Sequence, residues 1–392
     1  MSTANSRAPG RHFLQLPGPT NVPDRVQHAI ALPVIDHRGP EFSALTRDVI
    51  AGLKPVFQTK GDVVVFASSG TGAWEAALSN TLSPGDAVLM VRTGWFATLW
   101  EEMATKLGLE PLFLDTDWRR GADPAAIGAA LRADVAHRIK AVCVVHNETS
   151  TGCASPIAAI RAAIDSAGHP ALFFVDAISS LAALDYRHDE WGVDVTIAGS
   201  QKGLMLPPGL AFNAISAKAH AATATATLKR SYWEWKPMLA ANADGFFPAT
   251  PATTLLRGLK ESLSMLREEG LANVIARHAR HGAASRAAVA AWGLELQCAE
   301  PADVSGAVTT VRMPEGHSAD AFRSRILRQF NMSLGSGLGQ LKDKVFRIGH
   351  LGDLSDLQLA GALAGVEMGL KLAGVPHRAG GVAAGMEVLA AG

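Results

Sequence analysis

Short apolar runs alternate with amphipathic stretches along the first two-thirds of the chain. The runs are rich in β-branched and aromatic residues and show no polar alternation, which is typical of strands buried on both faces of a sheet. The strands predicted in this way lie at residues 63–66, 87–91, 141–145, 172–175 and 195–197. Between them, stretches such as 123–133 and 156–167 have helical periodicity, and Asp123 followed by Pro124 fits a helix start. Because helices connect successive strands, we expect the strands to run mainly parallel.

The pattern changes after about residue 257. Two long helices are predicted at 258–269 and 271–292, and they are followed by strands at 307–313 and 345–348 around a helix at 319–330. This change divides the chain into an N-terminal arm (1–16), a large α/β domain (17–268) and a smaller C-terminal α+β domain (269–392). The last residues, 379–392, are rich in alanine and glycine, so we expect them to fray.

Composition and charge narrow the classes of function. The chain has 392 residues, of which 48% are hydrophobic, enough to bury large cores without disulfide bonds or metals. Its 36 basic residues balance its 36 acidic residues, whereas a nucleic-acid binder usually carries a basic surplus, so we expect no nucleic-acid partner. Its three cysteines form no Cys-x-x-Cys motif, so we predict no metal site. The first residues lack the apolar core of a signal peptide, and no apolar run reaches about 18 residues, so we predict a cytoplasmic protein without a membrane partner.

A run of small residues follows the first predicted strand. Residues 68–73 are Ser-Ser-Gly-Thr-Gly-Ala, and they precede a helix that is expected to begin at Trp74. Small residues let backbone N–H groups approach an anion, and a helix N-terminus adds positive potential. The run lacks the lysine of a P-loop and the glycine spacing of a dinucleotide-binding motif. It fits a phosphate-binding loop, although an ordinary strand-to-helix turn fits the same residues equally well.

Two charged residues stand at the ends of later strands. Asp176 ends an apolar run, so its carboxylate needs a cationic partner, such as a protonated ring nitrogen, or the amides of its own loop. Lys202 lies in the glycine-flanked segment 199–203. A desolvated lysine loses its charge more readily and can form a Schiff base, while a lysine in a surface loop is the more common case. Because ligands of parallel α/β sheets bind at the carboxyl ends of strands, we expect these features to share one site.

Together the loop, Asp176 and Lys202 match the needs of pyridoxal 5′-phosphate (PLP), which requires a phosphate anchor, an amine for its aldehyde and an acid at its pyridine nitrogen. The chain resembles the class V aminotransferases of PLP fold type I, in particular the serine–glyoxylate and alanine–glyoxylate aminotransferase group. The motifs that carry the resemblance span nearly the whole chain and include LPGPTN at 16–21, DHR at 36–38, SGTGAWE at 69–75, HNET at 146–149, GSQKG at 199–203 and KVFRIGH at 344–350. The resemblance implies an aspartate aminotransferase-like fold, with a mainly parallel seven-stranded sheet in the large domain and a smaller C-terminal α+β domain.

The resemblance also implies roles for individual residues. Lys202 would be the Schiff-base lysine and the catalytic base, and Asp176 would face the pyridine nitrogen. The other residues implied to bind the cofactor are Ser69, Gly70, Thr71 and Gln201 at the phosphate, Thr149 at the phenolic oxygen and Phe96 over the ring. The residues implied to bind substrate are Arg347, which would hold the carboxylate, and Gly18, His37 and Arg38. Thr250 would reach the phosphate of a neighbouring subunit, which implies a homodimer with shared active sites.

The implied activity is transamination from an L-amino acid to glyoxylate, with serine as the favoured donor and with glycine and hydroxypyruvate as products. Aspartate and alanine are alternative donors. A PLP lyase or desulfurase and a non-catalytic PLP-binding homologue are alternative functions; the desulfurase would need a mobile cysteine at the pocket. The chain departs from the family pattern at Gly39, Trp95, Ala177 and Ala249, which leaves the shape of the substrate pocket open.

Overall fold

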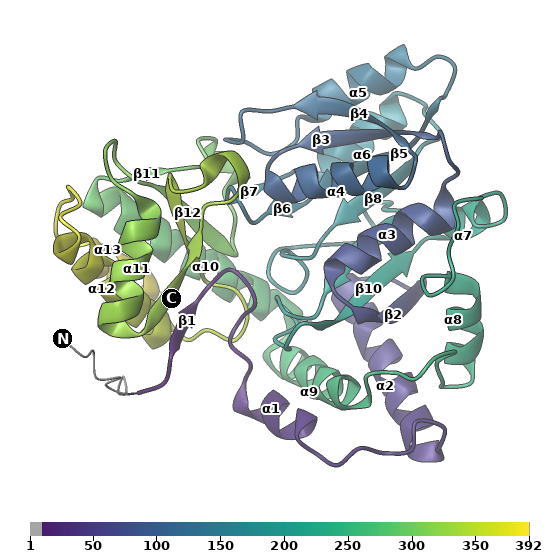
Figure 1. Cartoon of the computed structure of the whole chain (residues 1–392), viewed down its shortest axis with the longest axis horizontal. Helices are drawn as coiled ribbons and strands as arrows, with labels where there is room; N and C mark the ends of the chain where they lie inside the picture. Colours follow the sequence, from purple (N-terminus) through teal and green to yellow (C-terminus); the bar gives the residue numbers. More distant parts are fainter. Residues whose placement is uncertain (1–9, 392) are drawn as a thin grey trace, which may run out of the picture.

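Two main sheets organise residues 10–391, which are the residues that the computed structural model describes (Figure 1). In this part of the chain the larger sheet consists, in spatial order, of β2 (Asp62–Ser68), β10 (Gly209–Ile215), β9 (Val195–Gly199), β8 (Leu172–Asp176), β5 (Ile139–Val145), β3 (Ala87–Arg92) and β4 (Glu110–Asp115). Its neighbours are parallel except where β10 pairs with β2 and β9. The predicted seven-stranded, mainly parallel sheet is therefore confirmed.

Alternate residues of the central strands face opposite helical layers. In β2, Val63 and Val65 enter one core, whereas Val64 and Phe66 enter the other. The first core is covered by α1 (Asp24–Ile30), α2 (Pro40–Phe57), α5 (Pro124–Ala133), α6 (Ile157–Ser166) and α9 (Thr253–Glu269). The second core is covered by α3 (Gly70–Thr81), α4 (Trp95–Lys106), α7 (Ala217–Ala222) and α8 (Trp235–Ala243). Burial on both faces explains why these strands lack polar alternation.

Two strands of the larger sheet were not predicted from the apolar runs. β4 lies at the edge of the sheet, is mostly exposed and contains Pro111. β10 contains the buried polar residue Asn213, whose side-chain amide donates to the carbonyl oxygen of Ala73 at 3.2 Å. Both strands depart from the continuous apolar pattern for these local reasons.

The smaller sheet has, within residues 10–391, the order β1 (Phe13–Gln15), β13 (Met332–Ser336), β14 (Val345–Gly349), β12 (Val308–Arg312) and β11 (Glu295–Leu296). The helices that pack with it are α10 (Leu271–Trp292), α11 (Ala319–Phe330), α12 (Asp356–Leu372) and α13 (Gly381–Ala390). β1 belongs to the predicted arm, yet it pairs in parallel with β13, so in Figure 1 the purple β1 forms the edge of a sheet of green strands. Residues 1–9 of the arm lie outside the described residues, and the domain boundaries stay predictions.

The expectation that residues 379–392 fray is wrong for the helix α13. Gly381 lies against the indole of Trp292, and Gly385 lies against Leu363. Small residues let this helix approach its neighbours closely, and its own Leu389 is buried in the same hydrophobic core. Among residues 10–391, no helix combines the length and the apolar character that a membrane crossing requires.

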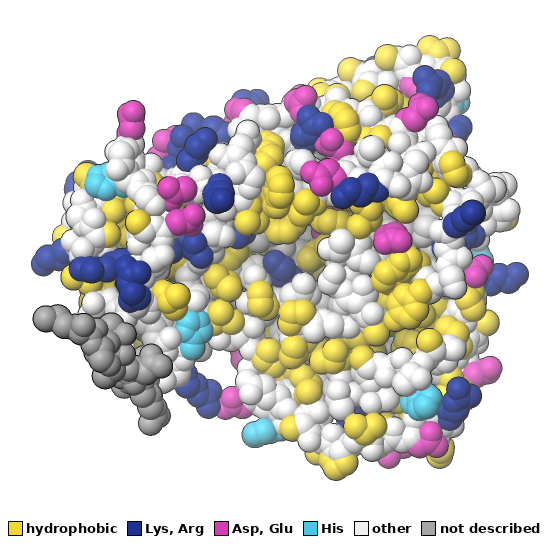
Figure 2. Space-filling view, viewed as in Figure 1, with side chains coloured by type: hydrophobic (Ala, Val, Ile, Leu, Met, Phe, Trp, Pro, Cys, Tyr) yellow, Lys and Arg dark blue, Asp and Glu magenta, His cyan; other side chains and the backbone are white. Residues whose placement is uncertain are grey.

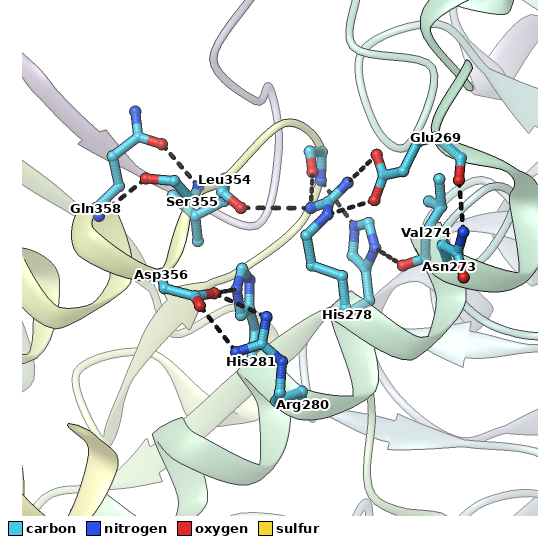
Figure 3. A network of polar contacts seen from close by, with 12 residues as sticks. Glu269, Asn273, Val274, His278, Arg280, His281, Leu354, Ser355, Asp356 and Gln358 are labelled. Atoms are coloured by element: carbon cyan, nitrogen blue, oxygen red, sulfur yellow. Dashed lines mark hydrogen bonds and ion pairs between the residues drawn. The ribbon is translucent and has the colours of Figure 1, made fainter. Parts of the chain in front are cut away.

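A network of polar contacts joins the start of α10 to the loop that follows β14 (Figure 3). Arg277 forms two hydrogen bonds with the carboxylate of Glu269, at 2.7 and 3.0 Å, and one with the carbonyl oxygen of Gly352, at 2.8 Å. The Nε2 atom of His278 accepts from the N–H of Gly352, so its Nδ1 atom donates to Val274. Burial lowers the pKa of His278 to about 3, and the imidazole stays neutral. The network therefore fixes the loop after β14 without a buried imidazolium.

The segment 16–20 passes between the two sheets and touches both. Its residue Pro17 accepts a hydrogen bond from Lys202, which follows β9, and the backbone of Leu16 and Pro17 lies against Gly349 at the end of β14. A Cβ atom on Gly349 would overlap the carbonyl group of Leu16. Because that group is backbone, it cannot turn aside as a side chain could.

Gly349→Ala is therefore expected to lower the free energy of unfolding by about 1–3 kcal/mol, since the added methyl group forces two backbone segments apart. Urea unfolding followed by tryptophan fluorescence measures the change. Gly306→Ala is the matched control: its Cβ would meet only ordinary contacts of 3.7 Å or more, and the expected change is below about 0.5 kcal/mol. Equal stability of the wild type and Gly349→Ala would contradict the close approach.

Candidate active site

The carboxyl ends of the central strands meet at a cavity of about 240 Å³. The predicted residues that line it are Gly18, Ser69, Gly70, Thr71, Phe96, Thr149, Asp176, Gln201 and Lys202. They come from the segments after β1, β2, β3 and β9, from the end of β8 and from the turn between the short strands β6 (Asn147–Glu148) and β7 (Cys153–Ala154). A larger hollow of about 650 Å³ between α2 and α9 contains none of the predicted residues. The strand-end argument thus brings most of the predicted residues to one place.

Helix α3 begins directly at the predicted phosphate-binding loop. Ser69 is its N-cap and Gly70 its first residue, so the prediction that the helix starts at Trp74 is wrong. A side chain on Gly70 would overlap Ile178, which explains the small residue there. The first amides of a helix have no partner within it and lie at the positive end of its dipole. The corrected start places residues 69–71 where a phosphate group binds best.

Asp176, the last residue of β8, is held by two hydrogen bonds. The Nε1–H group of Trp74 donates to its Oδ2 atom at 2.9 Å, and the backbone N–H of Ile178 donates to its Oδ1 atom at 2.7 Å. Trp74 itself stacks on Trp100, with ring centroids 5.8 Å apart, so the donor is fixed. Burial raises the pKa of Asp176 to about 7 against these hydrogen bonds. A cationic ring nitrogen beside Asp176 would hold the carboxylate in its ionised form.

Lys202 lies in the turn after β9 with its amine enclosed. Its Nζ atom donates to the carbonyl oxygen of Pro17 at 2.8 Å, and a side chain on Gly18 would overlap the lysine. Burial, and then the nearby positive charge of Arg347, lower the pKa of Lys202 to about 8. Near pH 7, a much larger fraction of the Lys202 amine is therefore uncharged than in an exposed lysine. Only the uncharged amine can act as a nucleophile.

Arg347 reaches the site from β14 of the smaller sheet. Its Nε–H donates to the carbonyl oxygen of Ser336 at 2.8 Å, and its Nη1–H donates to that of Thr149 at 2.9 Å. Burial lowers the pKa of Arg347 to about 10, and within residues 10–391 no carboxylate forms an ion pair with it. A buried guanidinium with unused N–H groups suits a planar carboxylate ligand.

Two buried oxygen atoms in the cavity, Asn147 Oδ1 and Gln201 Oε1, have no hydrogen-bond partner among the described residues. Buried polar atoms are normally paired, so a polar ligand is expected to complete the site. The hydroxyl of Thr149 lies within hydrogen-bonding distance of that of Ser179 at the same wall. Amides for a phosphate, an amine for an aldehyde and a carboxylate for a pyridine nitrogen are all present, and these residues fit PLP.

Four predicted residues do not line the cavity of their own chain: Arg347, which contacts the lining residue Thr149, and Thr250, Arg38 and His37. Thr250 and Arg38 are exposed, and His37 is half-buried. The role implied for Thr250 depends on a second subunit, and the roles implied for all four residues stay predictions.

The residues at which the chain departs from the family pattern also lie outside the cavity lining: Gly39, Trp95, Ala177 and Ala249. Trp95 packs instead with Trp118 against the small domain at Gly339.

Sequence reasoning missed seven residues of the cavity: Pro19, Trp74, Val145, Asn147, Ile178, Ser179 and Pro208. A signal existed for Trp74, because it follows Gly70 by one helical turn and so faces the same side of the helix.

The low pKa of Lys202 can be measured by reductive methylation of the cofactor-free protein with formaldehyde. Only the neutral amine reacts, so the rate at Lys202 is expected to rise with pH through a midpoint near 8. Arg347→Gln removes a nearby positive charge and should move the midpoint to higher pH. Peptide mass mapping follows each site, with the exposed Lys236 as internal reference. A wild-type midpoint at the ordinary value of 10.5 would contradict the burial of the amine.

Comparison with known proteins agrees with this geometry. The family model "Aminotransferase class-V" matches residues 19–338. A serine–glyoxylate aminotransferase of Methylorubrum extorquens is 50% identical over 393 residues and 98% of each protein, and an L-aspartate–glyoxylate aminotransferase of Paracoccus denitrificans is 45% identical over 95% of this chain and 94% of that protein. The crystal structure of a ureidoglycine–glyoxylate aminotransferase from Bacillus subtilis has a TM-score of 0.89 at 28% identity, over 99% of this chain and 100% of the other. The predicted fold type I and its cofactor PLP are confirmed, and the chain belongs to the class-V aminotransferase family.

Proposed function

We propose that this aminotransferase moves the amino group of an L-amino acid to glyoxylate, with serine as the favoured donor and with glycine and hydroxypyruvate as products. The observation that carries the proposal is the convergence of a buried amine, a buried carboxylate and a buried guanidinium at one site, from Lys202, Asp176 and Arg347. Relatives named for serine–glyoxylate and L-aspartate–glyoxylate transamination, at 50% and 45% identity, support the same acceptor.

Each of these residues has a separate task in the reaction. Bound PLP supplies an aldehyde for an amine and an electron-withdrawing ring. Asp176 would hold the ring nitrogen protonated, because burial disfavours an ionised carboxylate that has no cation beside it. Lys202 Nζ would accept the Cα proton of the donor, and a pKa of about 8 suits a base that works near neutral pH.

Arg347 accounts for the use of one site by two substrates in turn. Donor and acceptor both carry a carboxylate next to the reacting carbon, and the guanidinium can hold one carboxylate at a time. The 2-oxo acid product must therefore leave before glyoxylate enters. Alternating occupancy of this kind gives ping-pong kinetics.

Charges near the cavity favour a donor with one carboxylate. Lys202 is committed to the cofactor, and Arg323, another cation close to Arg347, is already paired with Asp320 at 2.8 Å. Serine needs only Arg347, whereas aspartate needs a second cation. Aspartate is the second candidate donor because of the relative named for it, and Arg38 of a second subunit is the candidate cation.

The positions of the cysteines disfavour a desulfurase. Cys143, Cys153 and Cys298 are all buried, and none of them lines the cavity. Burial also raises the pKa of the Cys143 thiol, which disfavours the thiolate that such a reaction needs. Cysteines without disulfide partners support a cytoplasmic location, which we keep as part of the proposal.

A homodimer with shared sites is also part of the proposal. Thr250, Arg38 and His37 lie outside the cavity of their own chain, as residues that serve a neighbouring site would. Leu32 and Val34, close to His37 in sequence, are 52% and 74% exposed. Hydrophobic side chains also gather over the face of the large domain in Figure 2. Exposed apolar surface of this kind is typical of an interface between subunits.

The function is tested by separating its two half-reactions. Excess L-serine is expected to remove the violet absorbance of the Lys202-bound cofactor, and glyoxylate is expected to restore it. Lys202→Ala should slow amino-group exchange by about 10²–10⁴-fold or more, because the nucleophile and the base are both lost. A screen of serine, aspartate and alanine, with chromatography of the 2-oxo acids, identifies the donor. Normal exchange by Lys202→Ala, or absorbance that ignores every donor, would contradict the proposal.

Arg38→Ala distinguishes the two candidate donors. If Arg38 of one subunit binds the second carboxylate of a dicarboxylate in the other, its loss should raise KM for aspartate about tenfold or more and leave KM for serine within about twofold. Arg328→Ala, which removes an exposed arginine on α11, is the control and should change neither value. An unchanged KM for aspartate would remove Arg38 from the site.

A further inference from the structure

The N-terminus of α4 is held by side chains that come from another part of the chain. Helices leave their first amides without partners inside the helix. Here the N–H of Trp95 donates to Ser150 Oγ at 2.9 Å, and those of Phe96 and Ala97 donate to the two carboxylate oxygens of Glu148 at 3.4 and 3.1 Å. Ser150 and Glu148 follow β5, so a long-range contact replaces the local cap that the helix lacks.

Glu148 is fully buried, with 0% of its surface exposed, and its geometry leaves little freedom. Its Oε1 atom also accepts from the N–H of Ser150 at 3.1 Å and from the Ser150 hydroxyl at 2.6 Å. A Cβ atom on Gly94 would overlap the Glu148 side chain. Burial raises the pKa of Glu148, and these four donors oppose the rise because each favours the ionised carboxylate.

The contact fixes a residue of the active site. Phe96 is the second residue of α4 and lines the cavity at the place implied for the ring of the cofactor. Thr149 lies between Glu148 and Ser150, and its carbonyl oxygen accepts from Arg347 at 2.9 Å. The segment 148–150 therefore joins the helix that carries Phe96 to the guanidinium that faces the substrate.

We propose that Glu148 is a positioning residue, which holds the start of α4 so that Phe96 covers the PLP ring. The inference rests on the proposed binding of PLP at Lys202. Glu148 itself does not line the cavity, so it acts through Phe96 and not by contact with the cofactor.

The test is the affinity of the cofactor-free full-length protein for PLP. Glu148→Gln keeps the shape of the side chain but replaces one acceptor oxygen by an N–H₂ donor that faces the helix amides. We expect PLP to bind about 10–100-fold more weakly, because a small displacement of a positioning group has effects of this size. The visible circular dichroism of bound PLP should change as well, because it depends on the tilt of the ring. Ser150→Ala removes one donor and should act in the same direction with a smaller effect.

Glu367→Gln provides a matched control. Glu367 accepts from the N–H groups of Gly380 and Val382, at 3.1 and 2.9 Å, and so caps α13 in the same way but far from the cavity. Its replacement should lower the melting temperature, while PLP affinity and the dichroism stay within about twofold of the wild type. If Glu148→Gln behaves like this control, the role of Glu148 is structural and the proposal is overturned.

A double-mutant cycle tests the route through Phe96. Phe96→Ala alone should weaken PLP binding, and adding Glu148→Gln to it should change the affinity by less than about twofold. Additive losses would overturn the proposal, since Glu148 would then act independently of Phe96. If the wild type itself binds no PLP or exchanges no amino group, the proposed function fails; if it does both and the cycle is additive, only the positioning role fails.

Discussion

Desolvation of one amine is the constraint on which the site depends. Lys202 has a backbone carbonyl, that of Pro17, as its hydrogen-bond partner and lies near the positive charge of Arg347. Both burial and this charge favour the neutral amine, and Asp176 and Glu148 oppose them only in part. The surroundings of Lys202 thus lower its pKa before any ligand binds, and its reactivity is a property of the folded chain.

That environment is assembled from both sheets. Lys202 and Asp176 come from strands of the larger sheet, whereas Arg347 comes from β14 of the smaller sheet. The segment 16–20 touches both sheets, and Gly349 allows it to pass close to β14. Under the proposed function, this arrangement would hold the carboxylate of either substrate at one place relative to Lys202.

Sequence reasoning found what depends on local pattern. The central strands were predicted because both of their faces are buried, and Asp176 and Lys202 were predicted because each follows such a strand. The bond from Trp74 to Asp176 joins residues 102 positions apart, and the cap that Glu148 provides for α4 has no local signal. α13 was missed for a related reason, since Gly381 and Gly385 pack closely against residues distant in sequence and Leu389 is buried in a core that other helices share.

The proposed phosphate site and the proposed carboxylate site differ in the kind of hydrogen-bond donor that each offers. Among the described residues, the cavity wall at the start of α3 presents neutral groups, from Ser69, Gly70, Thr71 and Gln201. Helix amides can bind a phosphate without a cationic side chain. Arg347 donates to the carbonyl oxygens of Ser336 and Thr149, outside this loop, and under the proposed function its remaining N–H groups would bind a carboxylate. In the proposed reaction, a cation at the phosphate loop would compete with Arg347 for the substrate carboxylate, whereas the neutral loop would leave that carboxylate to Arg347.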